Sequence, residues 1–295
     1  MRVAGPSLKA RNYWRKREAQ FLAVLKRALV LLRMENSLPE AECDLNRRLY
    51  FYLLEATREL CPKNGIAPTQ ECNNQPDPDD ETRAGREQKR PDFQWIYLDQ
   101  YEPDPRRSSK QFVVECKRLG MALRADWVLN SNYVEHGVCR FRDSQWAYAR
   151  RFVSGAMVGY WQAMEAEQVL SEVNAVARRN ALTELVLQGA WNYAGVSTLG
   201  QTFERTFEVS PFHLYHLWVD VRSLSQSDAG RGRRAARMPK TAKTKTIPYD
   251  VAEQLRTPEE MAAYLDAWSA EAPDDAAGIT RALGDIARAR QAGRA

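Results

Sequence analysis

Two short stretches of the chain carry charged residues where a buried β-strand would have apolar ones. The first is Asp92 followed by Phe93-Gln94-Trp95-Ile96-Tyr97, and the second is Phe112-Val113-Val114-Glu115-Cys116-Lys117. Because side chains alternate along a strand, Glu115 and Lys117 share one face. Burying such charges is costly unless they are paired or bind a metal ion. The residue types therefore indicate a metal site in which Asp92 lies beside Glu115 and Lys117.

A structural interpretation of the same residues is also open. Glu115 and Lys117 could form an ordinary ion pair on an exposed edge strand, and Asp92 could be a turn residue after Pro91. Both strands are mostly apolar, however, which is typical of central strands covered on both faces. A central strand with Glu and Lys on one face needs a compensating partner, and a metal site supplies one.

A helix upstream supplies a third acid. The segment Ser37-Leu38-Pro39-Glu40 has the form of a capped helix start, and we expect this helix to extend over residues 37–61. Glu42 has the phase of the helix's apolar stripe, which would direct it inward. The alternative is a solvated first-turn acid that the helix dipole favours. The stripe consists of Leu45, Leu49, Leu53, Ala56 and Leu60.

The order Pro91-Asp92, a gap and then Glu115-Cys116-Lys117 resembles the signature of the PD-(D/E)XK nuclease superfamily. This resemblance covers residues 37–221 and implies a restriction-endonuclease-like fold. It also implies that Asp92, Glu115, Glu42 and the backbone carbonyl of Cys116 bind one or two Mg²⁺ ions, for which Mn²⁺ can substitute. In such a site Lys117 orients or deprotonates the attacking water, or stabilises the phosphate during hydrolysis.

Composition sets the outer limits. The 295 residues include 44% hydrophobic residues and eight Trp, which support a folded core in one large domain or two modest ones. Five cysteines without a CxxC pair and three widely spaced histidines argue against zinc modules and disulfide frameworks. We interpret His213 and His216 as surface or core residues. No segment has the layout of a membrane span or signal peptide, so we expect a cytoplasmic protein without membrane contact.

Four regions are expected along the chain. Residues 1–36 form a basic helical lead, and residues 37–221 form the nuclease-like core, with a flexible loop at 62–89. Residues 222–248 form a basic linker or arm, and residues 249–295 form C-terminal helices. The predicted fold class is α/β, a restriction-endonuclease-like core whose central mixed β-sheet is flanked by helices, with helical additions at both ends.

Within the core, a crossover helix is expected to begin at Asp143 or Ser144. Its apolar positions, at helical spacing, are Trp146, Ala149, Val153, Met157 and Tyr160. Helical structure is expected over 165–194, and strands over 203–209 and 212–221. The strand that should precede the Pro-Asp strand has few candidates, either residues 65–67 or the sequence nearer Arg90.

Basic residues away from the carboxylates are candidates for contacts with nucleic acid. Arg140 either reaches a phosphate or makes a structural ion pair. The basic arm lies among Ser, Gly, Ala and Thr, a composition that cannot build a core. It is therefore either a linker or a segment that binds along a nucleic-acid backbone. The arm residues predicted to contact nucleic acid are Arg231, Arg233, Arg234, Arg237, Lys240, Lys243 and Lys245.

Together with the resemblance, these features predict a Mg²⁺-dependent endonuclease that hydrolyses DNA, with a role in anti-phage or mobile-element defence suggested by the family. The expected partners are DNA, a second copy of the chain, or a defence-system protein. One alternative is a catalytically silent subunit that binds nucleic acid or acts as a scaffold in a larger complex. A further alternative is an enzyme that processes RNA.

Overall fold

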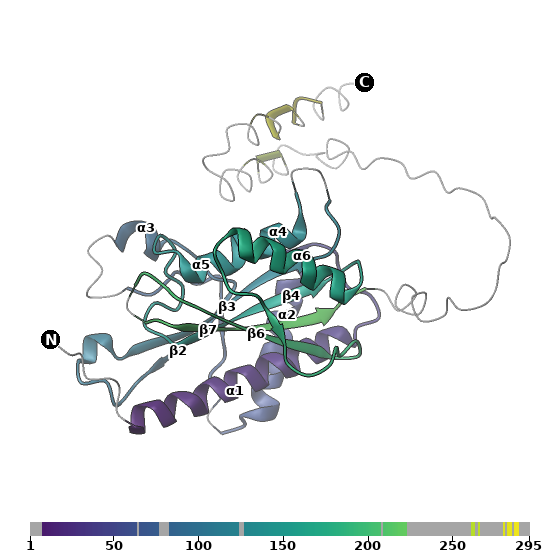
Figure 1. Cartoon of the computed structure of the whole chain (residues 1–295). Coiled ribbons are helices and arrows are strands. Elements are labelled where there is room, and N and C mark those ends of the chain that lie inside the picture. Colours follow the sequence, from purple (N-terminus) through teal and green to yellow (C-terminus); the bar gives the residue numbers. More distant parts are fainter. Residues whose placement is uncertain are drawn as a thin grey trace. The chain divides into compact units, whose positions relative to one another are not determined.

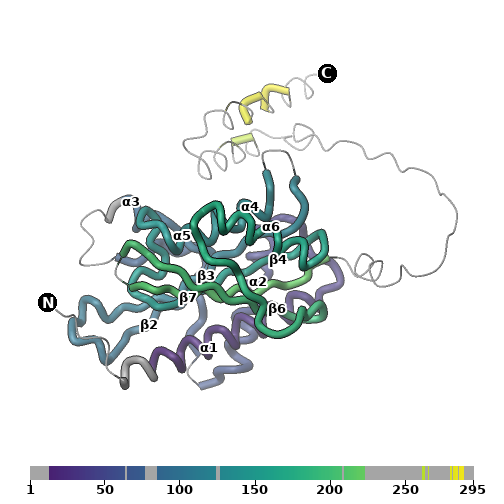
Figure 2. Tube along the Cα trace, in the orientation of Figure 1, coloured from purple at the N-terminus to yellow at the C-terminus, as the bar shows by residue number. Residues whose placement is uncertain are grey.

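The computed structural model describes residues 8–63, 65–76, 83–123, 127–207 and 209–222, and short fragments between 261 and 288. The chain divides into two compact units, residues 1–233 and 234–295. Within the described part, the first unit is an α/β fold built on a seven-stranded mixed sheet flanked by helices (Figures 1 and 2). The described residues of the second unit include short helical stretches in which Met261, Ala282 and Ile286 are buried.

The first elements in chain order are α1 (Leu8–Arg33), α2 (Glu42–Leu60), β1 (Thr69–Gln70), α3 (Arg83–Glu87), β2 (Phe93–Leu98), the 3₁₀ turn η1 (Pro105–Arg107) and β3 (Ser109–Leu119). A crossover segment follows, made of α4 (Leu129–Tyr133), the π-helical turn η2 (Val134–Val138) and α5 (Cys139–Arg142). The remaining elements are β4 (Ser154–Trp161), α6 (Ala166–Arg179), β5 (Val186–Leu187), β6 (Val196–Phe203) and β7 (Phe212–Asp220).

The strand order across the sheet is β1-β2-β3-β4-β7-β6-β5. The central strands β3, β4 and β7 are parallel, and the outer pairs are antiparallel. A parallel pair needs a crossover connection, which α4, η2 and α5 supply between β3 and β4. In the β2–β3 ladder Phe93 pairs with Val114. Continuing this register by one residue places Asp92 opposite Glu115.

Helices cover both faces of the sheet (Figure 1). Helices α1 and α2 pack on one face, and α4, α5 and α6 lie over the other. On the α1 face the ring of Phe112 lies 5.9 Å from that of Phe21 and 6.2 Å from that of Trp14, between centroids. Because side chains alternate along β3, Glu115 and Lys117 point to the opposite face, toward the crossover segment.

Helix α1 has charged residues between its apolar positions, so only one side of it is buried. Its buried stripe consists of Phe21, Val24, Leu25, Ala28, Leu29 and Leu32. In the described part of the chain, no helix combines the length and the apolar character that crossing a bilayer requires.

Helix α2 begins later than the sequence predicts. Its first residue is Glu42, and the N-cap position, Ala41, makes no side-chain capping bond, so the predicted capping box at Ser37 and Glu40 is wrong. The segment before the helix is held by another part of the fold instead. The backbone carbonyl of Glu40 accepts a hydrogen bond from Gln162 Nε2 at 2.7 Å, just beyond β4.

The predicted helix from residue 143 through Tyr160 is also wrong, because residues 154–161 form the central strand β4. All eight residues of β4 are buried, so the strand shows no alternation that would distinguish it from a buried helix. Gly159 allows close packing here. A Cβ atom at this position would lie 2.5 Å from Leu119 Cδ1 and 2.6 Å from Trp218 Cδ1.

Other boundaries also differ from expectation. Helix α6 ends at Arg179 instead of continuing to residue 194. The strand predicted at 203–209 is wrong, because the strand of this region is β6, Val196–Phe203, which shares only Phe203 with it. The strand expected at 212–221 is confirmed as β7. The strand that precedes the Pro-Asp strand is Thr69–Gln70, which pairs with Gln94 and Phe93. It lies within the region 62–89 that the sequence predicts to be a loop.

Candidate catalytic site

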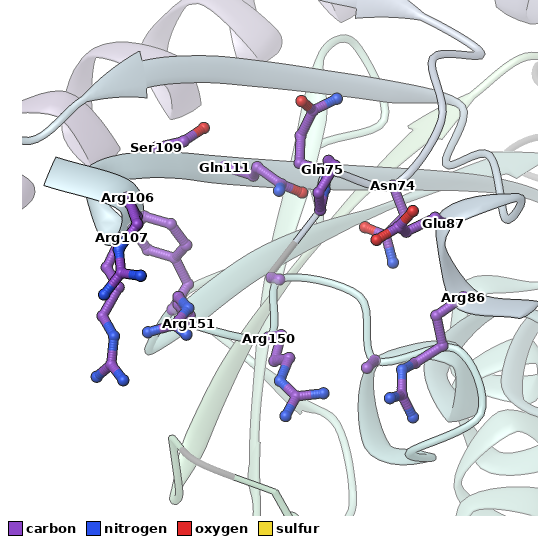
Figure 3. A pocket seen from close by; sticks show the side chains of 14 residues that line it. Asn74, Gln75, Arg86, Glu87, Arg106, Arg107, Ser109, Gln111, Arg150 and Arg151 are labelled. Carbon is purple, nitrogen blue, oxygen red and sulfur yellow. The ribbon is translucent and has the colours of Figure 1, made fainter. Parts of the chain in front are cut away.

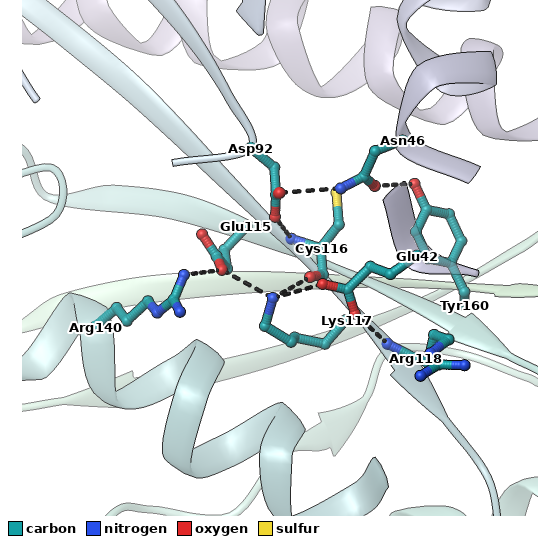
Figure 4. Close-up of polar contacts among 9 residues, drawn as sticks. All are labelled: Glu42, Asn46, Asp92, Glu115, Cys116, Lys117, Arg118, Arg140 and Tyr160. Atoms are coloured by element: carbon teal, nitrogen blue, oxygen red, sulfur yellow. Dashed lines mark hydrogen bonds and ion pairs between the residues drawn. The ribbon is translucent and has the colours of Figure 1, made fainter. Parts of the chain in front are cut away.

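Four residues predicted from the sequence, Glu42, Asp92, Glu115 and Lys117, meet in what we call the carboxylate cluster (Figure 4). They come from the start of α2, the residue before β2, and the middle of β3. The Lys117 Nζ atom lies 2.7 Å from Glu42 Oε1 and 3.0 Å from Glu115 Oε1. It also donates a hydrogen bond to the backbone carbonyl of Cys116 at 2.8 Å. The ammonium therefore has three acceptors for its three N–H groups.

Asp92 is held by two hydrogen bonds. Its Oδ2 atom accepts one from the backbone N–H of Cys116 at 2.6 Å, and its Oδ1 atom accepts one from Asn46 Nδ2 at 2.9 Å. Burial, followed by the negative charge of Glu115, raises the pKa of Asp92 well above its ordinary value, although Lys117 opposes the shift. The two carboxyl groups thus experience each other's charge, as expected from the β2–β3 register.

Glu115 is the most buried acid of the cluster, with 1% of its side chain exposed. Its Oε1 atom contacts both Lys117 and Arg140. Its Oε2 atom is buried and finds no hydrogen-bond donor among the described residues. An unpartnered carboxylate oxygen in the interior is destabilising. It is also the kind of hard oxygen ligand that Mg²⁺ prefers.

Arg140 reaches the cluster from α5. Its Nη1 atom forms an ion pair with Glu115, and its guanidinium lies over the Trp146 ring, with Cζ 4.3 Å from the centroid. The sequence leaves two roles open for Arg140. The structure shows an ion pair with Glu115, and contact with a phosphate stays a prediction. About a fifth of the side chain is exposed, so solvent reaches it.

The protonation of Lys117 follows from its neighbours. Burial alone would lower the pKa of Lys117, but the charges of Glu115, Glu42 and Asp92 outweigh burial and raise the pKa above its ordinary value. The side chain therefore stays an ammonium at neutral pH. In the arrangement described here, Lys117 is suited to donate hydrogen bonds and stabilise negative charge rather than to accept a proton.

The π-helical turn η2 passes directly over Lys117. A Cβ atom at Gly137 would lie 3.3 Å from Lys117 Cγ and 2.5 Å from Met157 Cε. Glycine thus allows the turn to approach the sheet closely at this point. The same segment then brings Arg140 to Glu115 three residues later.

Two polar residues that contact the cluster were not predicted. Asn46 lies one turn after Glu42 on α2, donates to Asp92, and accepts a hydrogen bond from the Tyr160 hydroxyl at 2.8 Å. The four-residue spacing of Glu42 and Asn46 was a usable signal, because such residues share a helix face. No residue spacing indicated the contact of Tyr160 with Asn46, because the sequence pattern predicts a helix where β4 lies.

Tyr148 is a third neighbour of the cluster that the sequence does not predict. Its hydroxyl is buried and has no hydrogen-bond partner among the described residues. Burial, followed by the charge of Glu115, raises the pKa of Tyr148. The phenol is therefore a neutral donor close to the acids. It lies in the turn region after α5, where the residue pattern carried no indication of a site.

A divalent cation such as Mg²⁺ needs several hard oxygen ligands. Across the described ranges, no three His, Cys, Asp or Glu side chains converge as a ready-made ligand group. Glu42 is directed to Lys117 and to the backbone N–H of Arg118, at 3.2 Å. Asp92 and Glu115 nevertheless fit such an ion, because they are adjacent acids and the Glu115 Oε2 atom has no hydrogen-bond partner in the described part of the chain.

The arm predicted to contact nucleic acid, from Arg231 through Lys245, lies outside the described residues. Comparison of the chain with protein-family models, with curated proteins and with solved structures finds no match.

Proposed function

We propose that this chain is a metal-dependent endonuclease that hydrolyses phosphodiester bonds in DNA. The observation that carries the proposal is the meeting of Asp92, Glu115 and Lys117 next to the buried Glu115 Oε2 atom, which has no hydrogen-bond partner among the described residues. The antiparallel β2–β3 pair and the crossover to a parallel β4 support the PD-(D/E)XK resemblance. The proposed biological setting, defence against phage or mobile elements with DNA and a further protein copy or partner, comes from that resemblance.

Asp92, Glu115 and the Cys116 carbonyl would hold Mg²⁺ or Mn²⁺, with Glu42 as a further candidate ligand. When bound, such an ion lowers the pKa of a coordinated water and neutralises charge on the scissile phosphate. Glu42 has a second role in this proposal. It accepts from Lys117 Nζ and from the Arg118 N–H, and so fixes the ammonium beside Glu115.

The other residues orient these groups. Asn46 and the Cys116 N–H hold the Asp92 carboxylate in place through its two oxygens. Lys117 and Arg140 place two positive charges against Glu115. Charged N–H donors of this kind stabilise the negative charge that develops on a phosphate during hydrolysis, and they do so most strongly where water is excluded.

A catalytically silent subunit that binds nucleic acid is the second candidate. It is favoured by the charge balance of the cluster, in which Lys117 and Arg140 already compensate Glu115 and Glu42. A balanced buried network of this kind is compatible with a purely structural role. The two candidates differ in one outcome, which is whether a metal ion makes the purified chain cut DNA.

The test is a plasmid-nicking assay with the full chain in Mg²⁺, Mn²⁺ or EDTA. We expect cleavage with either metal and none in EDTA. Lys117→Ala, Glu115→Gln and Asp92→Asn should each lower the rate by on the order of 10²-fold or more, as expected for groups that act on the transition state. Lys110→Ala is the matched control, because Lys110 lies on the same strand but pairs with Glu102 at 3.0 Å.

Each outcome of the nicking assay decides between the candidates. Failure of the folded wild-type chain to cut in both metals, while it still binds DNA, would establish the silent subunit instead. A Lys117→Ala variant that cuts at the wild-type rate would remove Lys117 from the proposed site. Preference for an RNA substrate in the same assay would support the RNA-processing alternative.

A further inference from the structure

Two cations meet at the ring of Trp146, next to the carboxylate cluster. Arg140 Cζ lies 4.3 Å from the centroid of the ring, and Lys89 Nζ lies 4.3 Å from the same centroid. The two charged groups are therefore separated by no more than twice this distance. We call Lys89, Trp146 and Arg140 the cation–π triad.

The backbone holds Lys89 and Trp146 in place. The Lys89 carbonyl accepts a hydrogen bond from the Asn74 N–H at 2.8 Å, and the Lys89 N–H donates to the Arg86 carbonyl at 3.1 Å. The side chain of Asn74, which Figure 3 shows among the residues that line a pocket, donates to the Trp146 carbonyl at 3.1 Å. Asn74 thus connects the lysine and the tryptophan of the triad.

Only one of the two cations has an acid partner. Arg140 pairs with Glu115, whereas Lys89 forms no ion pair within the described part of the chain, where its side chain contacts the Trp146 ring. Two like charges at this separation repel each other. The negative face of an aromatic ring offsets part of such repulsion. An anion bound beside Lys89 would offset the rest.

Two independent connections place Lys89 beside the carboxylate cluster. Along the chain, Lys89 lies three residues before Asp92. Through space, the Trp146 ring joins it to Arg140, whose Nη1 atom contacts Glu115 Oε1. Lys89 is half-buried, so solvent reaches its side chain. A ligand that extends out of the cluster can therefore contact it.

The spacing of the two cations favours a nucleic-acid strand as that ligand. A strand carries one phosphate charge per nucleotide, at about 3.4 Å of rise along the helix axis. A strand whose scissile phosphate lies at Glu115 and Arg140 would therefore bring a neighbouring phosphate close to Lys89. Lysine binds phosphate as a point charge, which needs no fixed orientation of the phosphate oxygens.

We propose that Lys89 binds the backbone phosphate next to the scissile phosphate, and that Trp146 holds Lys89 and Arg140 at the spacing of these two phosphates. Lys89 is then a substrate-binding residue, and Trp146 is a positioning residue. The choice of phosphate rests on the proposed function, whereas the binding of nucleic acid by Lys89 does not.

The first test is binding of a fluorescent 30-base-pair DNA to the full chain in EDTA, measured by anisotropy at several salt concentrations. Lys89→Met keeps an apolar stem against the Trp146 ring and removes the charge. It should raise Kd about fivefold and lower the magnitude of the salt slope by about one. Lys89→Arg keeps the charge and should stay within about twofold of wild type.

The matched control is Lys63→Met, which removes the same charge from an exposed lysine that follows α2. Lys63 lies in a groove beside α1, which packs on the other face of the sheet from α5. This control should stay within about twofold of wild type. Circular dichroism verifies that each variant is folded. Equal changes in Kd and salt slope for Lys63→Met and Lys89→Met would mean that total charge matters and would overturn the inference.

Trp146→Leu tests the positioning role in the same assay. Because the ring is proposed to act on binding through Lys89, Trp146→Leu should raise Kd, and adding Lys89→Met to it should raise Kd by less than about twofold more. If the two substitutions instead multiply each other's effects, Trp146 does not position Lys89.

The second test locates the phosphate. DNA that carries a single neutral methylphosphonate is cut by the wild-type chain in Mg²⁺, and the cut positions are mapped. Wild type should cut the bond next to the methylphosphonate about fivefold less than it cuts the same bond in unmodified DNA. Lys89→Met has already lost this contact, so its cutting of that bond should change less than that of wild type.

The results separate the two proposals. If the wild-type chain binds DNA but never cuts it, the test in EDTA still decides whether Lys89 binds nucleic acid. If wild type cuts, but folded Lys89→Met binds with an unchanged Kd and salt slope, the inference about Lys89 is overturned and the nuclease proposal stands. Equal effects of the methylphosphonate on wild type and on Lys89→Met would overturn the proposed position of the phosphate.

Discussion

Two of the polar groups buried in the described sheet differ in charge. The carboxylate cluster on β2 and β3 contains ionised groups of both signs. The other group is a hydrogen-bonded chain in which Trp218 Nε1 donates to the Tyr133 hydroxyl at 3.0 Å. That hydroxyl lies 2.8 Å from His216 Nδ1. The indole can only donate, so the Tyr133 hydroxyl accepts from Trp218 and makes its second hydrogen bond with the His216 imidazole.

The difference between the two groups comes from their partners. Burial, followed by the charge of His213, lowers the pKa of His216 to about 3, and no acid among the described residues opposes this, so the imidazole is neutral. Burial acts on Lys117 in the same direction, but three acids reverse its effect. Of these two groups, the one that stays ionised is therefore the one in which opposite charges meet. His216 is a core residue, in agreement with its interpretation from the sequence.

The largest effect that distinguishes the two groups is expected at Glu115. Glu115→Ala leaves Lys117 and Arg140 without their shared acid in a largely buried site. We expect this change to lower the free energy of unfolding by about 3 kcal/mol, measured by urea denaturation with tryptophan fluorescence. The control is Glu59→Ala, which breaks an exposed pair with Arg27 and should cost less than about 1 kcal/mol. Equal losses in the two variants would mean that the cluster is not desolvated.

The neutral His216 should make the free energy of unfolding depend on pH. A histidine in the unfolded chain takes up a proton below about pH 6.5, whereas His216 in the folded protein does so only near its lowered pKa of about 3. The unfolded state thus binds more protons in this window, and stability falls as pH falls. Between pH 7 and pH 5, wild type should lose about 2 kcal/mol more than His216→Asn, measured by urea denaturation at each pH.

The control for the pH experiment is His213→Asn, on the half-buried opposite face of β7. This variant should retain most of the wild-type pH dependence. A His216→Asn protein that loses stability on acidification as steeply as wild type would show that the imidazole is not held neutral.

The smallest expected effect comes from a comparison of two tyrosines. Tyr160 supports the carboxylate cluster through Asn46, and Tyr133 belongs to the neutral hydrogen-bonded chain. Tyr160→Phe removes the donor to Asn46, which holds Asp92, and should lower the cleavage rate about tenfold, the lower end for groups that orient a metal ligand. Its cost in stability should be about 1 kcal/mol. Tyr133→Phe breaks the Trp218–Tyr133–His216 chain and should destabilise the fold without changing the rate of cleavage in folded protein. Equal losses of cleavage in both variants would contradict the separation of the two groups.

The core of the candidate site could be predicted because it depends on local alternation. Glu115 and Lys117 share a face by the period of two, and Asp92 starts the neighbouring strand. Glu42 lies beside Lys117, as its helical phase predicts, although the predicted helix start is wrong. Its phase is set by the apolar residues that follow it, such as Leu45 and Leu49, and not by the cap.

The features that the sequence does not predict each have a physical reason. Strand β4 is covered on both faces, so its residues show no alternation, and the helical spacing of Trp146, Ala149 and Val153 belongs to turns and an exposed position. The contacts of Arg140 with Glu115 and of Tyr160 with Asn46 join residues 25 and 114 positions apart. Such pairings depend on the completed topology, which the spacing of residues along the chain does not contain.

The π-helical turn η2 has a consequence for how this chain tolerates insertions and deletions. A π-helical turn closes i→i+5 hydrogen bonds, so it holds one residue more than an α-helical turn between the same flanking helices. We therefore expect that removing one residue from Val134–Val138 would leave Arg140 on the side that faces Glu115. The same deletion within a regular α-helix would rotate the following side chains by about 100°.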